Sequence, residues 1–250
     1  MKLMRVIWRL VLAIGHALNG YWIIRTTFPR LPPRMRELAV QAWARKMLEI
    51  CGIRLVVHGD PPAQGPMLLV CNHISWLDIL VMHAAGYCRF VSKSGVRHWP
   101  LIGVLSTGAG SMYIERESRR DAMRVVHHMA EGLRGSEVIA IFPEGTTSDG
   151  RQVLPFHANL IQAAISADAP VQPMALRFID IASGEPSTGP SYTGDETLVG
   201  SLWRTLSARP IAAHVRFGVP QHCDGRDRRA WARDLRAAVE ALGQETLPAA

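Results

Sequence analysis

A histidine and an aspartate stand five positions apart in the segment CNHISWLDIL, as His73 and Asp78. In one continuous helix that separation would turn the two side chains about 140° away from each other. Ser75 is a good N-cap residue, so a helix that begins there would leave His73 in the entry loop and Asp78 in the first turn. The carboxylate could then fix the imidazole tautomer, and the other ring nitrogen could take a proton from an alcohol. The pair therefore predicts general-base catalysis without a covalent enzyme intermediate.

The same residues have a purely structural interpretation. Ser75-x-x-Asp78 is also a capping-box pattern, in which the carboxylate would serve the start of the helix. His73 would then be an ordinary histidine at the end of a strand. The spacing leaves both interpretations open.

A second polar segment, IFPEGTTSDG at 141–150, runs from an apolar strand into a Pro-Glu-Gly turn. Gly145 permits a close approach of the backbone, and the hydroxyls of Thr146, Thr147 and Ser148 could line an anion pocket. The alternative is a plain glycine-rich turn with a buried Glu144.

A third segment, GSMYIER at 110–116, is a short strand that ends on Arg116. A guanidinium is a planar fork suited to phosphate or carboxylate. Lys93, Arg97 and Arg151 are further cations that could converge on the same ligand. Taken alone, Arg116 is equally compatible with a surface salt bridge.

Several other chemistries lose support. The chain has no G-x-S-x-G elbow, no G-x-x-x-x-G-K-[ST] loop, no H-E-x-x-H and no G-x-G-x-x-G, which disfavours serine hydrolases, nucleotide-binding enzymes and zinc peptidases. The four cysteines lie far apart without a C-x-x-C pair, so we expect neither a metal site nor a cofactor.

The elements that must hold these residues form an α/β pattern. With 250 residues the chain is long enough for one domain with a sizeable core, and we assign it to residues 51–250. Helical patterns alternate with short apolar runs, which predicts a largely buried sheet flanked by helices. Seven such runs are IRLVVHG, MLLVCN, CRFVSK, SMYIE, VIAIF, VQPMALRF and IAAHVRFG.

Residues 1–50 form a basic and apolar N-terminal region. Residues 1–60 hold ten Lys or Arg side chains against three carboxylates, which accounts for the whole net charge of +7. A basic excess on an apolar segment favours anionic lipid over nucleic acid. The stretch 6–24 is apolar but broken by Arg9, His16 and Asn19, so we expect a helix that lies in one leaflet, with a single span or a soluble core helix as alternatives. Prolines at 29, 32 and 33 end it, and a second helix is expected over 35–50.

Taken together and in order, NHISWLD, GSMYIER, FPEGTT and APVQPM resemble the four motif blocks of the glycerolipid acyltransferase family, which includes 1-acyl-sn-glycerol-3-phosphate acyltransferases. The resemblance covers about residues 55–220. It implies a mixed sheet flanked by helices, membrane docking by the N-terminal helices on the cytoplasmic face, and His73 as the base that Asp78 orients. It also implies acyl-CoA or acyl carrier protein as the donor, with lysophosphatidate converted to phosphatidic acid. The implied acceptor-binding residues are Lys93, Gly110, Arg116, Glu144, Gly145, Thr146 and Thr147, with Pro170 and Pro173 shaping the site.

Two positions depart from the family pattern. Tyr113 stands where a phenylalanine is usual, and Thr147 stands where many phosphatidic-acid-forming members carry an arginine. The loss of that arginine makes another lysolipid, such as lyso-ornithine lipid, the alternative acceptor. A membrane-bound thioesterase or lipid hydrolase and a non-catalytic membrane scaffold are the competing classes of function.

Overall fold

A seven-stranded mixed sheet forms the centre of the molecule in a computed structural model that describes residues 2–114 and 119–245. The strand order is β1-β7-β6-β2-β5-β3-β4, and β6 and β7 are antiparallel whereas all other neighbours are parallel. Each of the seven apolar runs supplies one strand, so the predicted sheet is confirmed. The strands are β1 (Ile53–His58), β2 (Met67–Cys71), β3 (Arg89–Lys93), β4 (Met112–Ile114), β5 (Val138–Ile141), β6 (Val171–Asp180) and β7 (Ile211–Phe217).

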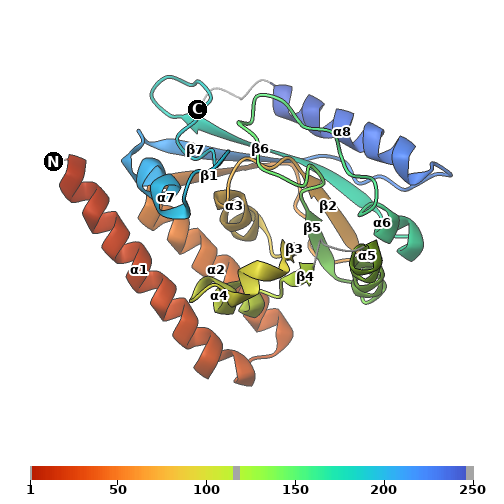
Figure 1. Cartoon of the computed structure of the whole chain (residues 1–250), viewed down its shortest axis with the longest axis horizontal. Helices are drawn as coiled ribbons and strands as arrows, with labels where there is room; N and C mark the ends of the chain where they lie inside the picture. The colour runs from red at the N-terminus through yellow and green to blue at the C-terminus, as the bar shows by residue number, and fades with distance from the viewer. Residues whose placement is uncertain (1, 115–118, 246–250) are drawn as a thin grey trace.

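Helices cover both faces of the sheet (Figure 1). One face carries α1 (Lys2–Thr26), α2 (Pro33–Cys51), α3 (Leu77–Ala85) and α7 (Leu198–Ser207), and the other carries α5 (Arg119–Arg134), α6 (Gln162–Ala167) and α8 (Arg228–Gln244). The remaining elements are α4 (Ile102–Gly108) and the 3-10 helices η1 (Phe28–Arg30) and η2 (Ser94–His98). Successive residues of β2 alternate between the two cores, Leu69 with the first set of helices and Leu68 and Val70 with the second. The predicted α/β sandwich with a buried sheet is therefore confirmed.

The N-terminal helices pack on the domain and share its core. Val6 and Ala13 of α1 and Leu48 of α2 belong to the same apolar cluster as the first face of the sheet. The two helices are joined by the rings of His16 and Trp43, which stack with centroids 5.0 Å apart and each donate to the other residue's carbonyl. The prolines end α1 at Thr26, and α2 begins at Pro33, since proline suits the first position of a helix.

The opposite side of α1 is an apolar stripe that no described element covers. Trp8 is 63% exposed, and the other members of this outer stripe are Leu3, Met4, Ile7, Val11, Leu12, Ile14, Leu18 and Trp22. Within the described ranges, α1 is the one helix long and apolar enough to cross a membrane, and 11% of its apolar stretch is buried. So little burial argues against a soluble core helix, the third of the alternatives above.

Candidate active site

The polar segments meet because neighbouring parallel strands end at one edge of the sheet. His73 follows β2, Glu144 follows the neighbouring β5, and Lys93 is the last residue of β3, the next strand along. Crevices at the carboxyl ends of parallel strands are where α/β proteins place their ligands. The topology therefore brings the first two motifs, and the cation Lys93, to one edge.

His73 and Asp78 make the contact that their spacing predicted. The helix α3 begins at Leu77, and the His73 Nδ1 donates to Asp78 Oδ2 at 2.8 Å. Ser75 lies one residue before the N-cap position, where its hydroxyl accepts the Leu77 N–H at 3.2 Å. The helix thus starts between the two residues, one position later than a Ser75 N-cap would place it.

The Asp78 carboxylate serves the helix start as well as the histidine. Its Oδ2 accepts the N–H groups of Ile74 and Ser75 at 2.6 and 2.9 Å, and its side chain is completely buried. The hydrogen bonds that the capping interpretation and the catalytic interpretation each require are therefore present in one arrangement. Three donors on one oxygen fix the carboxylate, and the carboxylate fixes the ring.

The imidazole of His73 is also held from its face. It stacks on Phe142 with ring centroids 3.9 Å apart and planes 10° from parallel. The side chain is 19% exposed, and within residues 2–114 and 119–245 no hydrogen bond is made to its Nε2. Because Nδ1 is occupied by the carboxylate, Nε2 is the nitrogen left to accept a proton from a substrate.

Glu144 supports the main chain beside the histidine. The residue is 4% exposed, and its two carboxylate oxygens accept the N–H groups of His73 at 2.6 Å and Leu154 at 2.8 Å. Burial raises the pKa of Glu144, and the two main-chain hydrogen bonds oppose that rise. Ser148, four residues on, donates its N–H and its hydroxyl to the His73 carbonyl at 2.8 and 3.2 Å. The second motif thus holds the His73 backbone at both ends.

The other members of that motif differ in what they can offer a ligand. Thr146 is exposed, whereas the Thr147 hydroxyl donates to the carbonyl of Tyr192. Gly145 has φ +74°, and a Cβ there would lie 2.9 Å from the His157 ring, so the turn needs glycine.

Of the remaining expected residues, Lys93 is exposed at the His73 edge, while Arg97 and Arg151 are exposed close to other side chains. The Arg97 guanidinium lies 5.9 Å from the Tyr113 ring centroid, and Arg151 is 3.6 Å from Asp149. Arg116 lies outside the described residues.

Gly110 is not brought to this edge, contrary to the expectation from its motif. It precedes β4, and its carbonyl accepts a hydrogen bond from Arg89 at the beginning of β3. The neighbouring parallel strands begin at that edge, so Gly110 lies toward the opposite edge from His73. Its φ of +83° and a Cβ that would meet the Tyr87 hydroxyl at 2.8 Å give it a structural role. Pro173 pairs with Val70 and places β6 beside β2, which is how the fourth motif frames the site.

Sequence reasoning missed Asn72, directly before the histidine. Its buried side chain bonds both main-chain groups of Leu176, at 3.0 and 2.8 Å, and so extends the β2–β6 pairing past the end of β2. A buried amide at a strand end is the signal that could have found it.

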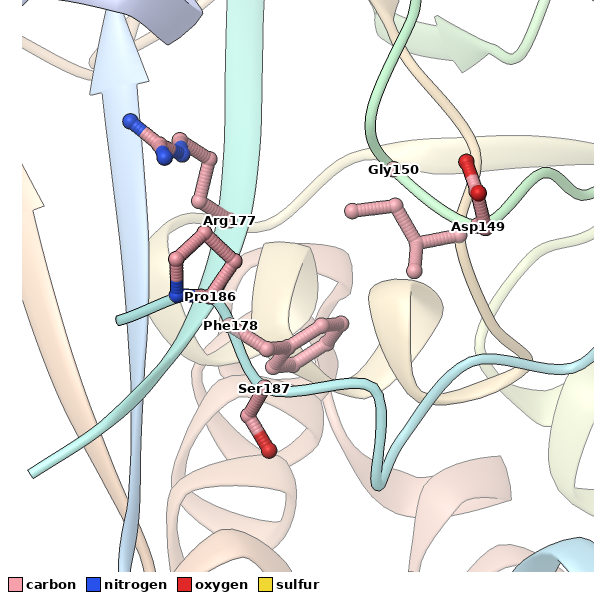
Figure 2. A pocket seen from close by; sticks show the side chains of 7 residues that line it. Asp149, Gly150, Arg177, Phe178, Pro186 and Ser187 are labelled. Carbon is pink, nitrogen blue, oxygen red and sulfur yellow. The ribbon is translucent and has the colours of Figure 1, made fainter. Parts of the chain in front are cut away.

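A pocket lies beside the loop that carries His73 and Ile74. Its lining residues are Ile74, Asp149, Gly150, Arg177, Phe178, Pro186 and Ser187 (Figure 2). In this view the Arg177 side chain extends away from Asp149 and Gly150, and its Nη1 donates to the carbonyl of Gly243 in α8. Within residues 2–114 and 119–245, no group of three or more His, Cys, Asp or Glu side chains could hold a metal ion.

The chain is similar to known lipid acyltransferases over nearly its whole length. It is 33% identical over 230 residues to a lyso-ornithine lipid O-acyltransferase of Pseudomonas aeruginosa, with 92% of this chain and 88% of that protein covered. It is 35% identical over 213 residues to a 1-acyl-sn-glycerol-3-phosphate acyltransferase of Neisseria gonorrhoeae, with coverage of 84% and 82%.

The fold comparison agrees. The crystal structure of the 1-acyl-sn-glycerophosphate acyltransferase PlsC of Thermotoga maritima matches with a TM-score of 0.64 at 17% identity, over 96% of this chain and 99% of that one. The family model described as Acyltransferase matches residues 54–177, which include His73, Asp78 and Glu144. The chain belongs to the acyltransferase family.

Proposed function

We propose that this chain moves a fatty acyl group from a thioester, acyl-CoA or acyl carrier protein, to the free hydroxyl of a lysophospholipid, with His73 as the general base. The first acceptor we propose is 1-acyl-sn-glycerol-3-phosphate, which would give phosphatidic acid. One observation carries the proposal: the His73 Nδ1 is bonded to the buried Asp78 carboxylate, and its Nε2 is left for a substrate.

In the proposed reaction Nε2 takes the proton of the acceptor hydroxyl as its oxygen attacks the thioester carbonyl. The C–S bond then breaks, and the imidazolium returns the proton to the departing thiolate. Asp78 stabilises the imidazolium that exists between these two transfers. General acid-base catalysis of this kind is worth about 10²–10⁴-fold in rate. Acyl and proton both end on products, so the histidine is unchanged after each turnover.

The identity of the headgroup rests on cations at the His73 edge. Lys93 is exposed there, and Arg151 is exposed beyond the Glu144 turn, 3.6 Å from Asp149; both side chains suit a phosphate, which supports lysophosphatidate. The Thr147 hydroxyl is bonded to the Tyr192 carbonyl, and no arginine stands at that position. That observation, with the lyso-ornithine lipid O-acyltransferases among the relatives, favours lyso-ornithine lipid as the second candidate.

An acceptor panel tests this proposal. The purified protein is incubated with a radiolabelled acyl thioester and lysophosphatidate, lyso-ornithine lipid or no acceptor, and the lipid products are separated. We expect acyl transfer to one of the two lysolipids and little free fatty acid. Free fatty acid that forms at the same rate with and without acceptor would instead identify a thioesterase, and no turnover with either donor would leave the scaffold role.

We also propose that α1 lies in the interface of the cytoplasmic leaflet, where a lysolipid acceptor resides. Its inner side is packed on the domain, and its outer stripe carries Trp8 and Trp22, residues that favour the headgroup region. The double variant W8S/W22S should float less with anionic liposomes than the wild type. Deletion of residues 1–50 would be a poorer test, because α1 and α2 contribute to the core. Unchanged flotation of the double variant would refute this placement.

A further inference from the structure

The loop between β6 and α7 returns across the catalytic loop. The strap, residues 186–197, first runs back along β6, where the Ser187 N–H donates to the Phe178 carbonyl at 2.8 Å. It then reaches Tyr192, whose N–H donates to the carbonyl of Ile74 at 2.9 Å. Ile74 is the residue after the catalytic histidine, so the strap is tied to the loop that carries the chemistry.

The same residue of the strap is tied to the Glu144 loop. The Thr147 hydroxyl donates to the Tyr192 carbonyl, and the next residue, Ser148, donates to the His73 carbonyl. Tyr192, Thr147 and Ser148 therefore close a ring of hydrogen bonds that runs from Ile74 through the strap and back to His73.

With this ring, every main-chain polar group of residues 73–75 has a partner. The N–H of His73 is bonded to Glu144, and those of Ile74 and Ser75 to Asp78. The three carbonyls accept from Ser148, from Tyr192 and from the Asp78 N–H. Buried backbone that is fully bonded is held in one conformation. The partner of the Ile74 carbonyl, the Tyr192 N–H, comes from the strap, whereas the other five partners come from the motifs of Asp78 and Glu144.

We propose that Thr147 is a positioning residue, whose hydroxyl locks the strap over the catalytic loop and so fixes His73 for proton transfer. This inference rests on the proposed acyl transfer and changes the role of Thr147 from headgroup ligand to lock. The hydroxyl's single proton is committed to Tyr192, so it cannot be donated to a phosphate at the same time.

The test compares Thr147→Val, which keeps the shape but loses the donor, with Thr147→Ser, which keeps the donor. Two readouts are measured: kcat and acceptor KM of acyl transfer, and amide hydrogen exchange of the peptide that covers 186–197. Misplacement of a catalytic group by about 1 Å can cost up to ~100-fold, so we expect Thr147→Val to lower kcat about ten-fold with acceptor KM within about two-fold. Hydrogen exchange in the strap should be faster in Thr147→Val than in the wild type. Thr147→Ser should keep kcat and the exchange rate close to the wild-type values.

Ser183→Ala is the matched control, because it removes a hydroxyl that accepts a local turn bond from the Glu185 N–H outside the strap. It should leave kcat and exchange in 186–197 unchanged. The lock is overturned if Thr147→Val raises acceptor KM several-fold with kcat kept, as a headgroup ligand would, or if exchange in the strap is unaltered. If the wild type transfers no acyl group, the proposed function fails, whereas the exchange measurement still supports or overturns the lock.

Discussion

Replacement of Glu144 by glutamine should weaken both the fold and the catalysis. Glu144 is 4% exposed, and each of its carboxylate oxygens accepts one main-chain N–H, from His73 and from Leu154. A glutamine has one oxygen for the two donors, so one buried N–H loses its acceptor at a cost of about 1–3 kcal/mol. At roughly 2–4 °C per kcal/mol for a chain of this size, the melting temperature should fall by about 2–12 °C. Because the His73 N–H is one of the two donors that Glu144 holds, we expect kcat to fall about ten-fold or more.

The assay pairs thermal unfolding in detergent micelles with initial rates of acyl transfer at varied acceptor concentration. Glu131→Gln is the control, since Glu131 is exposed on α5 and, within the described ranges, its carboxylate pairs with the exposed His127 alone. Its melting temperature and kcat should match those of the wild type. The reasoning is refuted if Glu144→Gln keeps the wild-type melting temperature and kcat. A raised acceptor KM with an unchanged melting temperature would show that Glu144 is a substrate ligand and not a support.

Other predictions concern buried and strained residues. Burial lowers the pKa of His83 to about 4, whereas the same side chain in the unfolded protein has a pKa of about 6.5. Below pH 6.5 the unfolded state therefore binds a proton that the folded state does not, and the free energy of unfolding falls as the pH drops toward 4. Between pH 7 and pH 5 the free energy of unfolding should fall by about 2 kcal/mol through His83, and His83→Phe should abolish this part of the pH dependence. An equal pH dependence of the melting temperature in wild type and variant would contradict the prediction. Gly145→Ala places a side chain at φ +74° against His157 and should cost about 1–3 kcal/mol, whereas Gly15→Ala, with open space on exposed α1, should cost nothing; equal melting temperatures would contradict this prediction.

The fold could be predicted almost completely because its signals are local. Seven apolar runs of strand length became the seven strands, and the prolines marked the boundary between α1 and α2. The alternation of Leu68, Leu69 and Val70 between two cores shows why such runs are apolar throughout. What periodicity could not give was the pairing of β1 with β7 and of β2 with β6, since each joins segments more than a hundred residues apart and leaves no pattern in either strand.

The candidate site was predictable where side chains make the contact. His73 and Asp78 needed only a helix start between them, which Ser75 indicated. Tyr192 could not be found, because it acts through its main-chain N–H and carbonyl, which every residue type except proline offers. The place of Gly110 could not be predicted, since the short strand β4 follows it and separates it from the edge where His73 lies.

The central claim is that His73 acts as the base in acyl transfer to a lysolipid. The measurement is the rate at which purified wild type and His73→Ala form diacylated lipid from an acyl thioester and the preferred acceptor, with melting temperature and liposome binding recorded for both. We expect transfer to fall by about 10²–10⁴-fold in the variant while melting temperature and liposome binding stay close to the wild type. A folded His73→Ala protein that still transfers the acyl group at the wild-type rate would contradict the mechanism.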